Sequence, residues 1–209
     1  MARVHPGLPA VRRPEQLSVV QRFAQLISTV GHPMLLLPLA IGFALQDARP
    51  GEGALPLSVV LLSLLLVAGF VVRARARAEV TDLDVSKREQ RPRLYVVSIF
   101  AVASSAFLLW WVGQPAQVWQ GSLVAMGLLF ASGVVNQLGL KASLHTSFGV
   151  YAAGVLGTRS LTLGAAALFL AALVGWSRTV LSRHTWPEVL AGLGLGLLSG
   201  LCLLRLPLQ

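Results

Sequence analysis

Two histidines lie beside basic residues at the edges of apolar stretches, where they could take part in phosphoryl chemistry. His145 lies in KASLHTS and His184 in SRTVLSRHTWPE, in which Glu188 follows His184 by four residues. A carboxylate at that spacing can accept a hydrogen bond from one imidazole nitrogen, which fixes the tautomer and makes the other nitrogen a better nucleophile. Structural explanations also stand: each histidine alone suits an interfacial position, and residues 185–188 fit a helix-capping box with proline in the first turn.

Basic residues accompany both histidines. Arginine suits phosphate because its guanidinium group is planar, permanently charged and able to form two parallel hydrogen bonds. Each arginine taken alone could equally anchor the cytoplasmic edge of a membrane span. The candidate donors are Lys87, Arg88, Arg91, Lys141, Arg178 and Arg183.

Membrane-spanning helices must position these groups. The chain has 209 residues, of which 55% are hydrophobic and 12% charged, whereas about a quarter of a soluble domain is charged. Apolar runs of roughly 20 residues recur, and each can cross a hydrocarbon core of about 30 Å as a helix. The sequence therefore predicts an all-α, polytopic transmembrane bundle of about six to seven spans.

The domain organisation is predicted to be simple. A basic, proline-broken segment of residues 1–16, without the pattern of a cleaved signal peptide, precedes a single transmembrane domain of residues 17–209. The first apolar segment should kink where His32 precedes Pro33. Residues 146–157 are short for a span, and the glycines of the last span predict close helix packing.

Charge and cysteine content narrow the functional classes. Cys202 is the only cysteine, so an intramolecular disulfide and a thiolate metal cluster are excluded. The net charge of +9 is spread beside apolar spans, which favours anionic lipids or phosphates over nucleic acid as partners. Three polar loops, residues 73–93, 141–147 and 177–187, are expected on one face, which the positive-inside rule assigns to the cytoplasm.

Three motifs resemble the signatures of the type 2 phosphatidic acid phosphatase (PAP2) superfamily, from about residue 81 to residue 200. Ser177, Arg178, His184 and Glu188 resemble the third signature, S-R-x5-H-x3-D. Lys87-x3-Arg91-Pro92 resembles the first, K-x6-R-P, and Ala142, Ser143, Leu144 and His145 resemble the second, P-S-G-H. Asp84 stands at the spacing of the family lysine, so Lys87 or Arg88 would have to supply that charge. Glu188 replaces the family aspartate, and Ala142 and Leu144 replace proline and glycine.

The resemblance implies metal-independent hydrolysis of a lipid phosphate through a phosphohistidine, with no cofactor. His184 would attack phosphorus, Glu188 would orient it, and His145 would protonate the leaving oxygen. The phosphoryl group would be held by Lys87, Arg88, Arg91, Ser143 and Arg178. The expected substrate is phosphatidic acid, a phosphatidylglycerol phosphate or a polyprenyl phosphate or diphosphate, in a bacterial inner membrane with the site facing the cytoplasm.

Two other functions are compatible with the sequence. The altered first and second signatures would suit a non-catalytic protein that binds anionic lipid or moves it between leaflets. Asp82 and Asp84 in TDLDVSKRE could bind Mg²⁺ through a diphosphate, as in membrane prenyltransferases. We favour a structural role for both aspartates, paired with nearby Lys87, Arg88 or Arg91.

Overall fold

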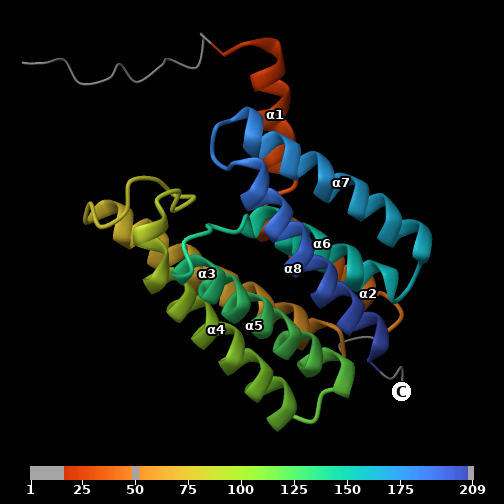
Figure 1. The fold of residues 1–209 in the computed structure, drawn as a ribbon. Helices are drawn as coiled ribbons and strands as arrows, with labels where there is room; N and C mark the ends of the chain where they lie inside the picture. Colours follow the sequence, from red (N-terminus) through yellow and green to blue (C-terminus); the bar gives the residue numbers. More distant parts are fainter. Residues whose placement is uncertain (1–16, 49–51, 207–209) are drawn as a thin grey trace, which may run out of the picture.

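A computed structural model describes residues 17–48 and 52–206, and these form an all-α bundle (Figure 1). The predicted N-terminal segment of residues 1–16 lies outside the described residues. The elements are α1 (Val19–Val30), α2 (Pro33–Ala44), α3 (Ala54–Ala76), the 3-10 turn η2 (Arg88–Gln90), α4 (Arg91–Trp111), α5 (Ala116–Gln137), α6 (Leu144–Gly157), α7 (Leu161–Val180) and α8 (Trp186–Arg205).

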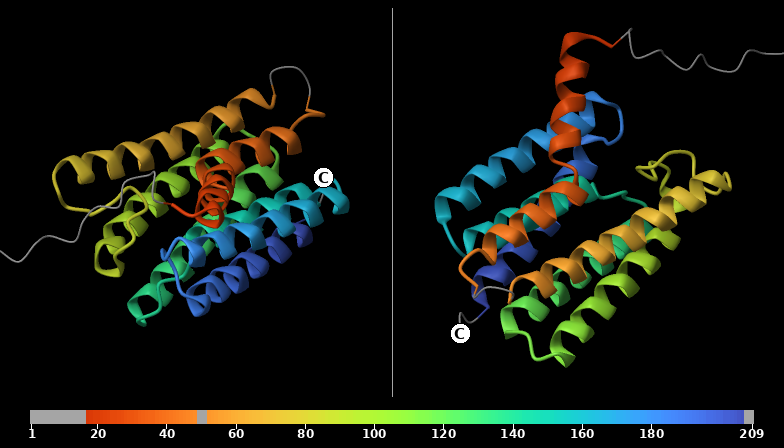
Figure 2. Two further views of the ribbon diagram at one scale, coloured as in Figure 1. Left: turned by 90° about the horizontal axis from the view of Figure 1, so that it is seen from above. Right: turned by 180° about the vertical axis from the view of Figure 1, so that it is seen from behind.

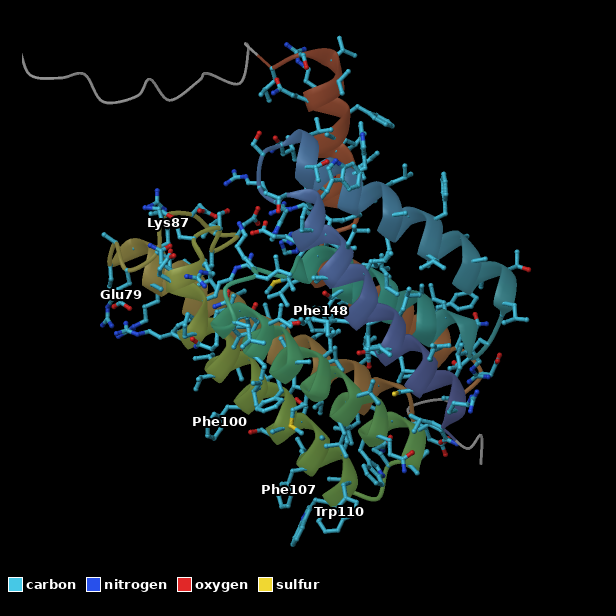
Figure 3. All side chains as sticks on the ribbon, viewed as in Figure 1. Glu79, Lys87, Phe100, Phe107, Trp110 and Phe148 are labelled. Carbon is cyan, nitrogen blue, oxygen red and sulfur yellow. The ribbon has the colours of Figure 1, made fainter. Side chains whose placement is uncertain are left out.

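Five of these helices, α3, α4, α5, α7 and α8, are long and apolar enough to cross a membrane, and the bent pair α1 and α2 could form a sixth span. Their outer surfaces are apolar: Phe100 and Phe107 extend from α4 and are 71% and 60% exposed (Figure 3). Apolar side chains exposed in such number indicate contact with lipid. The prediction of an all-α, multi-span membrane protein is confirmed, with five to six candidate spans.

The first apolar segment bends at the predicted position. The chain bends by 47° between α1 and α2, and Pro33 is the first residue of α2. His32 caps α2, because its Nδ1 accepts a hydrogen bond from the Met34 backbone N–H at 3.2 Å. α1 departs from the bundle beside the end of α7, whereas α2 lies within the bundle (Figure 2).

α6 is a short helix that other helices surround. It has only 14 residues, and its first ten after Leu144 are all buried because α2, α7 and α8 pack around it. α8 approaches closely through glycine: a Cβ at Gly192 would lie 2.6 Å from the Ser143 carbonyl oxygen, and one at Gly196 would lie 2.7 Å from that of Ser147. The predicted close packing of the last span is confirmed, and it holds the start of α8 against the start of α6.

Candidate functional site

The three polar loops meet at one end of the bundle (Figure 1). Lys141 Nζ donates hydrogen bonds to the carbonyl oxygens of Ser86, at 3.0 Å, and Arg183, at 2.9 Å. Arg91 Nε donates to the Val85 carbonyl, and its Nη1 donates to that of Ala142 at 2.8 Å. The prediction that these loops share a face is therefore confirmed, and two of the predicted cations link them.

A tight turn at the end of α7 places His184. The Arg178 carbonyl accepts hydrogen bonds from the backbone N–H groups of Arg183 and His184. Ser182 takes a left-handed conformation, with a φ of 54°, as is common where a helix ends and the chain reverses. The turn keeps the backbone of His184 against the last turn of α7, and the His184 side chain is 1% exposed.

Glu188 serves His184 and the N-terminus of α8 at once. One oxygen, Oε2, lies 3.0 Å from His184 Nδ1 and also accepts the Thr185 backbone N–H at 3.0 Å. Lys141 Nζ lies 3.7 Å from the same oxygen. The contacts that the orienting and capping explanations each require are both present, because one carboxylate oxygen has lone pairs for both.

The surroundings of His184 favour a neutral ring. Burial, followed by the nearby positive charges of Arg91, Lys141 and Arg178, lowers the pKa of His184 far below its usual value. A neutral imidazole that presents Nδ1 to a carboxylate carries its hydrogen on Nδ1 and its lone pair on Nε2. His184 Nε2 is thus available as a nucleophile or a base.

Arg178 is buried and faces Asp84. Its Nη2 lies 2.7 Å from Asp84 Oδ2, and its Nη1 donates to Ser28 Oγ at 2.9 Å. Burial opposes ionisation of Asp84, yet Arg178 and His145 outweigh it and hold the pKa of Asp84 below its usual value. The Arg178 Nε atom is buried without a hydrogen-bond partner, so the guanidinium group retains a free donor.

The ion pairs predicted for the two aspartates, Asp82 and Asp84, are wrong. Asp84 pairs with Arg178 and Asp82 with Arg183 at 3.9 Å, rather than with Lys87, Arg88 or Arg91. Asp82 also accepts the Ser86 hydroxyl at 2.9 Å, which shapes the loop. The predicted structural role of the aspartates holds for Asp82, whereas Asp84 points to residues of the site.

His145 and Ser143 lie at the start of α6. Ser143 caps α6, and its backbone N–H donates to the Glu188 carbonyl at 3.0 Å, so this amide is already engaged. His145 is 9% exposed, and its Nε2 is 4.0 Å from Asp84 Oδ1 with no hydrogen-bond partner. The His32 ring stands edge-on to it, with centroids 4.7 Å apart.

Two predicted phosphate-binding residues lie apart from this cluster. Lys87 is exposed on the outer side of the loop before α4 (Figure 3). Arg88 Nη1 donates to the Asn136 carbonyl at 3.4 Å, and Asn136 Nδ2 donates back to the Arg88 carbonyl. Lys141, rather than Lys87 or Arg88, places a positive charge beside His184 and Glu188. The sequence signal for this role was the position of Lys141, four residues before His145.

Two cavities meet at the cluster. A polar cavity of about 420 Å³ is lined by one face of α1, including Gln25 and Ser28, and by Arg178. An apolar cavity of about 200 Å³ extends among α2, α3, α4, α5 and α6. The residues common to both linings are His32, Asp84 and His145. An amphiphile could place its polar group in one cavity and its apolar chain in the other.

His32, Asp84 and His145 also have the spacing of a metal site, since one ligand atom from each lies within 4.8 Å of the others. The bonding of His32 opposes that use. Its Nδ1 lone pair accepts the Met34 N–H, so in the neutral ring Nε2 carries the hydrogen and offers no lone pair to a metal. The arrangement suits hydrogen bonding and proton transfer better.

Fold and spans define a multi-span helical membrane protein. In comparisons with known proteins, no family model matched the sequence, and no curated protein or solved structure gave a significant match. The phosphatase resemblance consequently rests on the motif residues themselves.

Proposed function

We propose that this protein is an integral membrane phosphatase that hydrolyses a lipid phosphate through a phosphohistidine. The observation that carries the proposal is the enclosed pair of His184 and Glu188, with the cations Arg178 and Lys141 beside it. A neutral histidine oriented by a carboxylate is suited to nucleophilic attack, and fixed cations stabilise the charge of a phosphoryl transition state.

In the proposed reaction, His184 Nε2 attacks phosphorus as the bond from phosphorus to the ester oxygen breaks. His145 gives a proton to the departing oxygen, and Arg91, Arg178 and Lys141 offset the phosphoryl charge. Water then attacks the phosphohistidine, gives up a proton to His145 and releases inorganic phosphate. Residues of this chain supply every group in the scheme.

A lipid is the favoured substrate class. The apolar cavity begins at Asp84 and His145 and continues past Leu64 and Val67 on α3, so a chain attached to a bound phosphoryl group has an apolar space beside it. Phosphatidic acid, a phosphatidylglycerol phosphate and a polyprenyl phosphate or diphosphate all have this form.

One observation favours a second candidate, a membrane protein that binds anionic lipid without turnover. The His184 side chain is 1% exposed and lines neither of the two cavities. Phosphoryl transfer requires the groups covering His184 to move. Oxygens of residues 84–86 contact four cations of this region, which are Arg91, Lys141, Arg178 and Arg183.

Phosphate release from lipid phosphates by the detergent-purified protein tests the proposal. With EDTA present, wild type should release phosphate from at least one of the lipid classes named above. His184→Ala should lower the rate by about 10³-fold or more, because loss of a nucleophile removes the covalent route. Arg93→Ala, an arginine of the same polar face with a side chain that is 76% exposed, is the control and should stay within about threefold of wild type.

Each alternative predicts a different result. Lipid binding by wild type with no turnover of any substrate would establish the non-catalytic candidate. A strict need for Mg²⁺, with loss of activity in Asp82→Asn, would support the prenyltransferase-like one. Full activity in His184→Ala would overturn the phosphohistidine mechanism.

A further inference from the structure

We propose that Asp84 is a positioning residue that holds a proton on His145 for delivery to the leaving oxygen. This inference rests on the proposed phosphatase function and adds a second carboxylate and histidine pair to it. The phosphatase resemblance assigns Asp84 no role, because that family has a lysine at this spacing.

The geometry places Asp84 between the proton donor and the phosphate-binding arginine. Its Oδ2 is 2.7 Å from Arg178 Nη2, and its Oδ1 is 4.0 Å from His145 Nε2. The His145 Nε2 atom is buried and has no hydrogen-bond partner. A small rotation of either side chain would convert the 4.0 Å separation into a charge-assisted hydrogen bond.

His145 needs such a partner because burial and nearby positive charge both disfavour its protonated form. Burial, followed by Arg178 on α7, lowers the pKa of His145, and Arg91 at the start of α4 acts in the same direction, whereas Asp84 raises it. His32, from the break between α1 and α2, packs edge-on, and His184 lies within electrostatic range. Among these groups Asp84 supplies the negative charge, and its low pKa keeps it ionised at neutral pH.

The proton can be followed through the reaction. As the P–O bond breaks and the bond from phosphorus to His184 Nε2 forms, the ester oxygen takes the proton from His145 Nδ1, while Nε2 keeps its hydrogen toward Asp84. Asp84 remains a carboxylate throughout, so it changes no bond itself. In the second step water forms the new P–O bond, the bond to His184 breaks, and the proton lost by water restores protonated His145.

The test compares two leaving groups. An alkyl phosphate, such as a lipid phosphate, leaves as a strongly basic alkoxide and needs the proton, whereas p-nitrophenyl phosphate leaves as a stable phenolate and does not. Asp84→Asn should lower kcat for the lipid phosphate by about 10²-fold while kcat for p-nitrophenyl phosphate falls by less than about threefold. The alkaline limb of the lipid pH profile should move to lower pH, because His145 loses its proton more readily without the carboxylate.

Three further variants separate positioning from structure. Ser28→Ala removes the other contact of Arg178 without touching His145, so it should affect both substrates equally. In a His145→Gln background, Asp84→Asn should add little, since Asp84 acts through that ring. If Asp84→Asn does not fold, Asp84→Glu, which retains the charge, should keep the wild-type ratio of the two rates.

Equal losses on both substrates in Asp84→Asn, or an unmoved pH profile, would overturn the proposal and leave Asp84 as a structural partner of Arg178. An additive effect in the His145→Gln background would do the same. If wild type hydrolyses neither substrate, the proposed function itself fails, which is a separate outcome.

Discussion

At the scale of single residues, Glu188 combines two roles that sequence patterns present as competitors. Its Oε2 accepts the Thr185 N–H at the start of α8 and contacts His184 Nδ1. Helix capping fixes the carboxylate in place, and the fixed carboxylate then fixes the imidazole. Capping thereby becomes part of the site rather than an argument against it.

Glu188→Gln separates the two roles. The amide oxygen can still cap α8, so the free energy of unfolding should fall by about 1 kcal/mol or less. The neutral side chain no longer stabilises positive charge at His184 and can favour the wrong tautomer, so phosphate release should fall by about 10² to 10⁴-fold. Thermal unfolding and lipid-phosphate turnover measured on the same preparation check both values. A variant with wild-type turnover would leave Glu188 with capping alone.

At the scale of elements, the contact between α6 and α8 sets the distance between the two histidines. The carbonyl of Glu188 accepts the Ser143 N–H, and Gly192 lies one turn further along α8 against the Ser143 carbonyl. Both contacts involve backbone atoms, which cannot rotate away as a side chain can. Space for a methyl group can be made only by moving a helix.

Gly192→Ala should therefore separate the starts of α6 and α8. Its new Cβ would lie 2.6 Å from the Ser143 oxygen, so we expect a loss of about 1 to 3 kcal/mol of stability and at least a tenfold loss of turnover. Gly194→Ala is the matched control, since its Cβ would meet nothing within 4 Å. Thermal unfolding and phosphate release measure the two losses. Equal stability and turnover in the two variants would show that the contact between Gly192 and Ser143 does not set the position of the site.

At the scale of the whole molecule, the two halves of the bundle contribute different parts of the proposed site. α6, α7 and α8 supply His145, Arg178 and the turn that carries His184. α2, α3, α4 and α5 enclose most of the apolar cavity, and α6 completes its lining. The loop before α4 joins the halves through Asp84 and Arg178.

A variant in which a large side chain fills the apolar cavity should bind long-chain lipid phosphates more weakly. Val67→Trp places an indole in the cavity and should raise the KM for a long-chain lipid phosphate about tenfold, equivalent to roughly 1.4 kcal/mol of lost chain binding. The KM for p-nitrophenyl phosphate should not change. Leu62→Trp, on the same helix but 57% exposed, is the control. An equal rise in KM for both substrates would show that the lipid chain binds outside this cavity.

Local patterns in the sequence were enough to predict the membrane class, the helical fold, the bend at His32 and the convergence of the polar loops. These features depend on hydrophobic length, on the backbone of proline and on counting crossings, all of which are properties of contiguous residues. The adjacency of His184 and Glu188 was also accessible, because the two residues are only four positions apart and flank the predicted helix cap at Thr185.

Tertiary structure decided which charges meet. Asp84 and Arg178 are 94 positions apart, and the expected partners of Asp84 were its neighbours in sequence. Lys87 points outward while Lys141 enters the site, because the direction of a loop side chain depends on where the loop docks. His32 reaches His145 only through the packing of α2 on α6. Contacts between distant segments are set by the shapes and charges of all the surfaces that pack together, and no local pattern encodes those.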